Sequence, residues 1–417
     1  MNGYIFYNKA LIVKEKINNI NKNNNNTKKN SEQNKVENEN SDSVKEKEEI
    51  EKESNDSDFE EDEKENNINE FKFGEFNMKF IGVIKGHKGP VTSLVCTEDE
   101  NGDILLFSGS EDSSIIKWRL YLKDNEFDVC DFKEKEKIIL GEPKNIMQNH
   151  DSFITSLSLN SDNTQLISSS LDKKIIIWNI YNLNPELIIK DSKSEVLATC
   201  FSSDDKIILS GQKDKKLNLY NCKGGHLKSG DFKLNGYVTC FLKIKNKTIN
   251  YIAVGLSDGK VNIYNSEFNL YKEIPLSDKI KNKKEKLESK DEEQYSVVSL
   301  SVDEYGEYLF ISYRKGSILI YSLEELDEEN SLKSIIQHND EINSILFEDK
   351  FFEIIFIGDN KGFKIRKLKP SLIIYEDKSA ACLSFCFDKN KKYLFAGFGD
   401  GIIKVFHTYY NDSNKEY

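Results

Sequence analysis

The chain is poor in the residues that mark catalytic, metal-binding or membrane-spanning proteins. It has seven cysteines, five histidines and two tryptophans in 417 residues, and no two cysteines form a CxxC pair. Cysteines spaced in this way predict small core residues in a reducing compartment, and neither a zinc site nor a disulfide framework. No apolar run approaches the roughly 18 residues that a transmembrane helix requires. We therefore expect a cytoplasmic protein that does not insert into membranes.

Basic charge is also in the minority. The chain carries 59 Lys and Arg against 71 Asp and Glu, a net charge of −12, which disfavours general affinity for nucleic acid. Residues 1–75 are dominated by Asn, Lys and Glu and cannot bury enough apolar surface to offset the entropy of ordering the backbone. The sequence predicts a disordered Asn/Lys/Glu-rich arm over residues 1–75, a folded domain over residues 76–410 and a tail over residues 411–417.

Short apolar runs and charged turns alternate through the folded domain without a stretch of helical periodicity, which indicates an all-β fold. One element recurs seven times: an apolar run, a small residue, a charged turn, a second apolar run and, in most copies, an aromatic residue. Its first two copies, LLFSGSEDSSIIKW and QLISSSLDKKIIIW, end at Trp118 and Trp178. The seven turns are centred on Asp112, Asp172, Asp214, Asp258, Lys315, Asn360 and Asp400.

Four of the six intervals between these turns are 40–45 residues, the period of a four-stranded propeller blade. Insertions at residues 121–145 and 278–294 explain the two longer intervals. The sequence thus predicts a seven-bladed WD40 β-propeller, in which each sheet buries its faces against its neighbours around a ring. The last copy ends at Phe406 without a fourth strand. We expect residues 78–84 to supply that outer strand of blade 7 and so to close the ring.

The most conspicuous polar constellation occurs twice. It comprises His87, Ser108, Asp112 and Trp118 in blade 1, and His150, Ser168, Asp172 and Trp178 in blade 2. Serine, histidine and aspartate together suggest nucleophilic catalysis. Because the set recurs once per blade, however, it predicts a buried hydrogen-bond chain that runs from indole through serine and histidine to aspartate. Later blades keep parts of it, at Ser210, Asp214, Asp258 and Asp400.

The remaining candidates do not predict chemistry either. Cys382 and Cys386 lie four residues apart on an expected strand, so they should face one side of the sheet and pack in the core. Glycines at 397, 399 and 401 resemble a phosphate loop, but no helix follows them to present its amide groups. His338 is predicted to replace the blade histidine in blade 6. We therefore expect no catalytic residue, no metal and no cofactor.

Four stretches carry a family resemblance: KGHKGPVTSL (85–94), SEVLATCFSSDDKIILSGQKDKKLNLYN (194–221), DEINSILFEDKFFEIIFIGDNKGFKIRKL (340–368) and YLFAGFGDGIIKVF (393–406). Over residues 79–408 the chain resembles the receptor for activated C kinase family, also described as Gβ-like proteins, which bind the small ribosomal subunit. The resemblance implies a divergent, non-catalytic signalling scaffold. Its partners would be proteins and the small ribosomal subunit, with no small-molecule substrate.

One departure from the family concerns the turn of blade 1. The family carries an Arg-Asp-Lys triplet there that meets ribosomal RNA, whereas this chain has Glu111-Asp112-Ser113. An acidic turn should weaken docking on phosphates. Basic residues remain in blades 2 and 3, and we expect these to face RNA or a protein partner: Lys173, Lys174, Lys213 and Lys215. The alternative is a WD40 adaptor of another complex, in assembly or ubiquitin-ligase recruitment, without ribosome binding.

Overall fold

The computed structural model describes residues 2–3, 70–73, 76–122, 138–223, 225–229, 232, 234–245, 250–280, 292–303, 305–328, 330–348, 354–368 and 371–410. The predicted tail lies outside these residues, as does the predicted arm except for its residues 2–3 and 70–73. All strands belong to one compact unit, formed by residues 1–7 and 69–417. In the described part of the chain, no helix has the length and apolar character needed to cross a bilayer.

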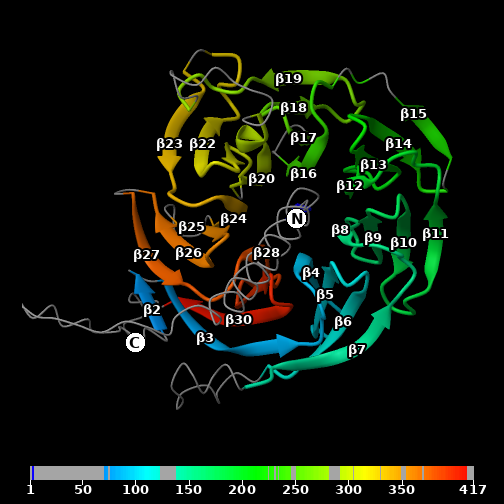
Figure 1. The fold of residues 1–417 in the computed structure, drawn as a ribbon, viewed down its shortest axis with the longest axis vertical. Helices are drawn as coiled ribbons and strands as arrows, with labels where there is room; N and C mark the ends of the chain where they lie inside the picture. Colours follow the sequence, from blue (N-terminus) through cyan, green and yellow to red (C-terminus); the bar gives the residue numbers. More distant parts are fainter. Residues whose placement is uncertain are drawn as a thin grey trace, which may run out of the picture. The chain divides into compact units, whose positions relative to one another are not determined.

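Seven antiparallel sheets form a ring around a central axis, so the predicted seven-bladed propeller is confirmed (Figure 1). The four strands of a blade follow one another from the centre outward and are here called a, b, c and d. Blade 1 contains β4 (Val91–Glu98), β5 (Ile104–Ser110), β6 (Ile115–Leu120) and β7 (Gly141–Met147). Blade 2 contains β8 (Ile154–Leu159), β9 (Gln165–Ser170), β10 (Ile175–Asn179) and β11 (Pro185–Ile189). Blade 3 contains β12 (Val196–Phe201), β13 (Ile207–Gln212), β14 (Leu217–Asn221) and β15 (His226–Ser229).

The other four blades repeat this order. Blade 4 contains β16 (Val238–Lys245), β17 (Asn250–Leu256), β18 (Val261–Tyr264) and β19 (Leu270–Ile274), and β1 (Asn2–Gly3) pairs with the inner edge of β16. Blade 5 contains β20 (Val297–Val302), β21 (Tyr308–Tyr313), β22 (Ser317–Ser322) and β23 (Leu332–Gln337). Blade 6 contains β24 (Ile342–Glu348), β25 (Ile354–Asp359), β26 (Phe363–Lys367) and β27 (Leu372–Asp377). The turn between strands b and c of a blade is here called its bc turn. Because neighbouring strands are antiparallel, all bc turns lie on one face of the ring, called the bc face.

Blade 7 is closed by the start of the folded chain, as predicted. It contains β28 (Cys382–Phe387), β29 (Tyr393–Phe398) and β30 (Ile402–Tyr410), and its d strand is β3 (Phe76–Lys85), which places Phe80 opposite Phe406. The rings of Phe80 and of Phe363 in blade 6 lie 5.5 and 5.3 Å from the ring of Phe406. Such aromatic pairs each add about 0.5–1.5 kcal/mol beyond the burial of their area. A further strand, β2 (Glu70–Phe73), pairs with β3, so regular structure begins before residue 76.

Both predicted insertions are partly ordered, which corrects their bounds. Strand β7 takes up the last five residues of the insertion at 121–145, and Asn145 lies opposite Lys117. Residues 123–137 lie outside the described residues. In the second insertion, a 3-10 helix η1 (Glu292–Tyr295) leads into β20. Residues 281–291, which lie between the start of this insertion and η1, are outside the described residues.

A β-bulge near the start of every a strand reverses the order of inward and outward side chains. In blade 7 it falls between Cys382 and Ser384. Cys382 therefore packs among the side chains between blades 6 and 7, while Cys386 packs among those between blades 7 and 1. The prediction that the two cysteines face one side is wrong, because a bulge inserts one residue and shifts the two-residue period.

Candidate functional site

In blade 1 the predicted polar residues form a continuous chain. The Trp118 indole N–H donates to Ser108 Oγ (2.8 Å), and Ser108 Oγ lies 2.6 Å from His87 Nε2. The other ring nitrogen, Nδ1, donates to the carboxylate of Asp112 (2.9 Å). Ser114, which the sequence reasoning missed, donates to the same carboxylate (2.6 Å). The Ser108 side chain is fully buried, and its hydroxyl has both of its hydrogen-bond partners, Trp118 and His87, inside the blade.

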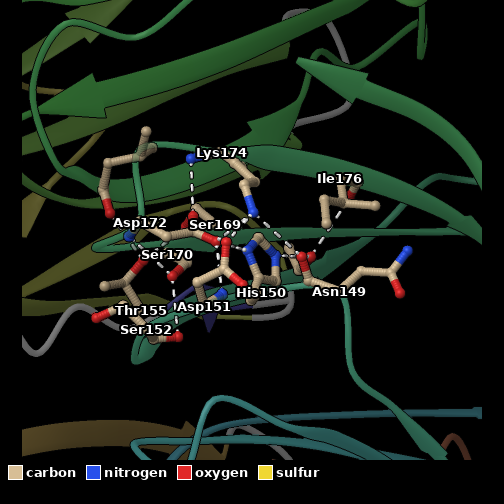
Figure 2. A network of polar contacts seen from close by, with 12 residues as sticks. Asn149, His150, Asp151, Ser152, Thr155, Ser169, Ser170, Asp172, Lys174 and Ile176 are labelled. Carbon is tan, nitrogen blue, oxygen red and sulfur yellow. Dashed lines mark hydrogen bonds and ion pairs between the residues drawn. The ribbon is translucent and has the colours of Figure 1, made fainter. Parts of the chain in front are cut away.

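Blade 2 repeats the polar chain with nearly the same geometry, and Figure 2 shows its His150 and Asp172. The Trp178 indole donates to Ser168 Oγ (2.9 Å), which lies 2.8 Å from His150 Nε2, and His150 Nδ1 donates to Asp172 (3.0 Å). Asp172 also accepts the backbone N–H of Asp151 and so anchors the strand before the blade to the bc turn. A serine whose hydroxyl is saturated in this way is no free nucleophile.

The histidines also hold both aspartates ionised. Burial is the largest influence on Asp172 and would raise its pKa. Hydrogen bonds from His150 and from backbone N–H groups, together with the charge of His150, lower the pKa to about 2. At Asp112 burial again acts upward, but the hydrogen bond and charge of His87 depress the pKa even further. Both carboxylates therefore act as hydrogen-bond acceptors within their blades.

The prediction of a network is corrected for Asp214, Asp258 and Asp400. Asp214 is exposed and pairs with Lys216 (3.0 Å). Asp258 is half-buried, which raises its pKa, and like the exposed Asp400 it accepts a backbone N–H of its own turn. The reason is local: the segments that precede these blades contain no histidine to draw the carboxylate inward.

Blade 3 keeps the serine of the network but not its partners. Ser210 occupies the same position of strand b as Ser108 and is fully buried. The Tyr220 hydroxyl lies near Ser210 and also interacts with Ser192, and Ser210 Oγ makes no hydrogen bond within the part of the chain that the structure describes. Ser192 lies where the first two blades have histidine, and it accepts a hydrogen bond from Gln212 (3.0 Å). In blade 3, a smaller set of polar side chains therefore replaces the hydrogen-bond chain of blades 1 and 2.

In blade 6 a buried lysine joins the predicted His338. The His338 Nε2 donates to Asp359 (2.8 Å), and the Lys364 ammonium lies 2.7 Å from both Asp359 and Asp340. His338 and the two aspartates bring ligand atoms within 4.8 Å of one another, as a metal site would. The ammonium already supplies the positive charge, so the four side chains form an ion-pair network.

Blade 7 also contains a buried lysine that is paired with a buried aspartate. Lys404, at the same position of strand c as Lys364, lies 2.7 Å from Asp377, and both side chains are buried. The sequence reasoning missed both lysines. A charged residue inside the apolar runs GFKIR and GIIKVF was the available signal, because an ion in such a run needs a buried partner.

The rim lysines of blades 2 and 3 differ in how they are held. Lys174 lies 2.5 Å from Asp151, which raises its pKa, and Lys213 lies 3.7 Å from Glu195. Lys173 and Lys215 are exposed, and neither has an ion pair among the residues that the structure describes. Their backbones adopt φ of 71° and 63°, in the left-handed region.

The inner strands of the ring carry no converging ionisable groups. Their first residues are small hydroxyl, amide or apolar side chains that link neighbouring blades, as where Thr92 Oγ1 donates to the Ile154 carbonyl (2.7 Å) and Thr155 Oγ1 to the Val196 carbonyl (2.9 Å). In the described a strands, charged residues occur only toward the far ends, at Glu98, Lys243, Lys245 and Glu348. The side chains of these inner strands therefore link neighbouring blades.

Three segments match the family described as "WD domain, G-beta repeat": residues 78–119, 141–179 and 184–221. They coincide with the closing strand and blades 1–3, of which blades 1 and 2 keep the histidine, serine and tryptophan and blade 3 keeps the serine. The chain carries WD40 repeats. The four remaining blades of this WD40 propeller share the strand order and the bulge but replace the polar chain.

The chain is similar to several known proteins over short segments. Over 103 residues the chain is 31% identical to Cross-pathway control WD-repeat protein 2 of Flammulina velutipes, covering 25% of this chain and 28% of the relative. It is 37% identical over 97 residues to small ribosomal subunit protein RACK1 of Schizosaccharomyces pombe (23% and 26%), and 31% over 100 residues to that of Candida albicans (24% and 27%). The alignments thus span about a quarter of each relative. The chain thus carries WD40 repeats in the matched segments and is similar to RACK1 over about a quarter of its length.

Proposed function

We propose that the chain is a non-catalytic cytoplasmic scaffold that docks on the small ribosomal subunit through the bc turns of blades 2 and 3. The observation that carries this proposal is the pair of exposed lysines, Lys173 and Lys215, at equivalent positions of neighbouring turns. Lysines that are free of carboxylates can neutralise phosphates and release their counterions, which is the main source of affinity for a nucleic-acid backbone. The name of the similar RACK1 proteins supports the same partner.

The backbone at these two lysines supports a functional role. The equivalent turn position is glycine in blades 4, 5 and 7, at Gly259, Gly316 and Gly401, with φ of 84°, 100° and 84°. A side chain in this left-handed conformation costs about 1 kcal/mol relative to glycine. Strain that is kept at an exposed position, where packing does not require it, is typical of binding sites.

A double variant separates binding from stability. Lys173→Gly/Lys215→Gly removes two charges and also relieves two strained turns, so we expect the melting temperature to stay the same or rise. Binding to purified small subunits should weaken, and the slope of log K against log salt should fall by about 1.4–1.8 for two lost phosphate contacts. The measurement is sedimentation with purified subunits over a series of salt concentrations.

The matched control is Lys391→Gly. Lys391 also has a left-handed backbone (φ 56°), but its turn joins β28 to β29 and so lies on the face opposite the bc turns. This change should leave both affinity and salt slope unchanged. Equal loss of binding in the control, or undiminished binding in the double variant, would contradict docking through blades 2 and 3.

The second candidate is an adaptor of another complex, without ribosome binding. It is favoured by an apolar feature on the face opposite the lysines, where Leu270 and Tyr271 at the start of β19 are about half exposed and Tyr271 stacks on Tyr251 (4.8 Å). Exposed aromatic side chains of this kind anchor protein interfaces. Affinity purification at two salt concentrations distinguishes the candidates: a single non-ribosomal complex that persists at high salt supports the adaptor.

A further inference from the structure

The three C-terminal strands of blade 7 join the start of the folded chain without a covalent bond, because β3, which continues into β4 of blade 1, only pairs with β30. Strand β28 lies beside β4, and the Ser384 hydroxyl donates to the Val91 carbonyl (3.2 Å). Gly397 leaves room for Val91, because a Cβ at this glycine would lie 2.7 Å from the Val91 side chain. Closure of the ring depends on the pairing of β3 with β30. A bond between β4 and β28 would hold the ring closed without that pairing.

Two cysteines meet where β28 lies beside β4. Cys96 on β4 and Cys386 on β28 pack against the same cluster of buried side chains between blades 7 and 1, and their thiols are hydrogen-bonded. The bulge at the start of β28 is what turns Cys386 toward blade 1, while it leaves Cys382 on the other side. Both residues of the pair are partly exposed, although the Cys96 thiol itself is largely buried. The two residues that a disulfide would join are thus already side by side.

The surroundings decide which oxidant can reach the pair. The hydrogen bond to Cys386, burial, and the negative charges of Asp388 and Glu98 raise the pKa of Cys96. Cys96 therefore keeps its proton more firmly, and we assign the attack on the oxidant to its partner Cys386. Because both residues are only partly exposed, a small peroxide can reach them more readily than the much larger glutathione disulfide.

We propose that Cys96 and Cys386 form a reversible disulfide when the protein meets hydrogen peroxide or another small neutral peroxide. The Cys386 sulfur attacks the O–O bond and becomes a sulfenic acid, and one water leaves. The Cys96 sulfur then attacks this sulfenic acid, the S–S bond forms, and a second water leaves with the Cys96 proton. In total, two thiols lose two electrons and two protons, and one peroxide is reduced to two waters. Thiol reductants reverse the bond by exchange.

The consequence is a propeller locked into its closed form. The disulfide would enclose almost all of the ring in a single covalent loop, and the stabilising effect of a disulfide grows with the length of that loop. We therefore expect the oxidised protein to melt several degrees higher than the reduced protein. The partner surfaces on the bc face are unchanged by this bond, so oxidation acts on the lifetime of the folded scaffold.

The test uses the full chain, reduced and then treated with hydrogen peroxide or with glutathione disulfide. After digestion with trypsin, the expected crosslink joins peptide 89–117 to peptide 379–389, and fragment ions must assign it to Cys386, since the second peptide also contains Cys382. Peroxide should give this crosslink and the higher melting temperature, dithiothreitol should reverse both, and glutathione disulfide should give much less of either.

Variants keep the proposal falsifiable. Cys386→Ser and Cys96→Ser should each abolish the crosslink and the rise in melting temperature, while Cys222→Ser, a change at a partly buried cysteine of blade 3, should retain both. The crosslink is mapped in the unaltered protein, so it does not depend on the folding of any variant. Oxidation of Cys386 to sulfinic acid without a crosslink, pairing with any other cysteine, or no reaction with peroxide would each overturn the proposal.

Discussion

Removing the hydroxyl of Ser108 tests whether the polar chain holds blade 1 together. In Ser108→Ala, the Trp118 N–H and the His87 Nε2 both lose their partner inside a blade that water does not reach. A buried polar group without a partner costs about 1–3 kcal/mol. Two such groups, with some relief from a shift of the His87 ring, give an expected loss of about 2–4 kcal/mol in the free energy of unfolding. Ser168→Ala should behave in the same way in blade 2.

Blade 3 supplies the matched control for this prediction. Ser210 has the same residue type, the same position on strand b and the same complete burial, but it lacks the imidazole and indole partners of Ser108. Ser210→Ala should therefore cost less than about 1 kcal/mol, the net worth of one hydrogen bond. The difference between the two substitutions isolates the imidazole and indole partners from the packing of the serine itself.

The assay is thermal and urea unfolding followed by circular dichroism and tryptophan fluorescence. A loss of 1 kcal/mol should lower the melting temperature by about 2 °C in a domain of this size. The chain has only two tryptophans, each bonded to its own serine, so each substitution should change the emission of one indole. The reasoning is refuted if Ser210→Ala costs as much as Ser108→Ala, or if neither change alters the fluorescence.

Three further predictions concern charge, packing and pH. Lys364→Met removes the buried ammonium that Asp340 and Asp359 share and should cost about 3–5 kcal/mol in urea unfolding. The exposed Lys361→Met should cost at most about 1 kcal/mol, and equal effects would contradict the buried network. Gly397→Ala should cost about 1–3 kcal/mol because its Cβ meets blade 1, while Gly399→Ala, with its nearest atom 3.6 Å away, should be neutral in the same assay. The folded pKa of Asp172, about 2, lies below its unfolded value, so its contribution is present above about pH 4 and is lost as the pH falls toward 2. Thermal melting against pH should show this loss, and Asp172→Asn should reduce it.

The number of blades, the closing strand and the polar chains of blades 1 and 2 could all be read from the order of residues. The turns recur at the period of a blade, and the segment before the first blade supplies the strand that the last blade lacks. Histidine, serine and tryptophan stand at the same spacing in the first two copies. Patterns of this kind follow from period and local turn geometry, which the sequence displays directly.

Only the tertiary structure decided which side chains meet across the seams. The bulge in β28 reverses the facing of Cys386 relative to Cys382, and no periodicity argument on an ideal strand contains that extra residue. The absence of a histidine before blade 3 leaves Asp214 in solvent, while Lys364 finds its carboxylates on two other segments. Cys386 packs with Cys96 of the first blade, and Lys364 reaches Asp340, 24 residues before it. The energies of these contacts depend on burial and on partner geometry, and a linear spacing specifies neither.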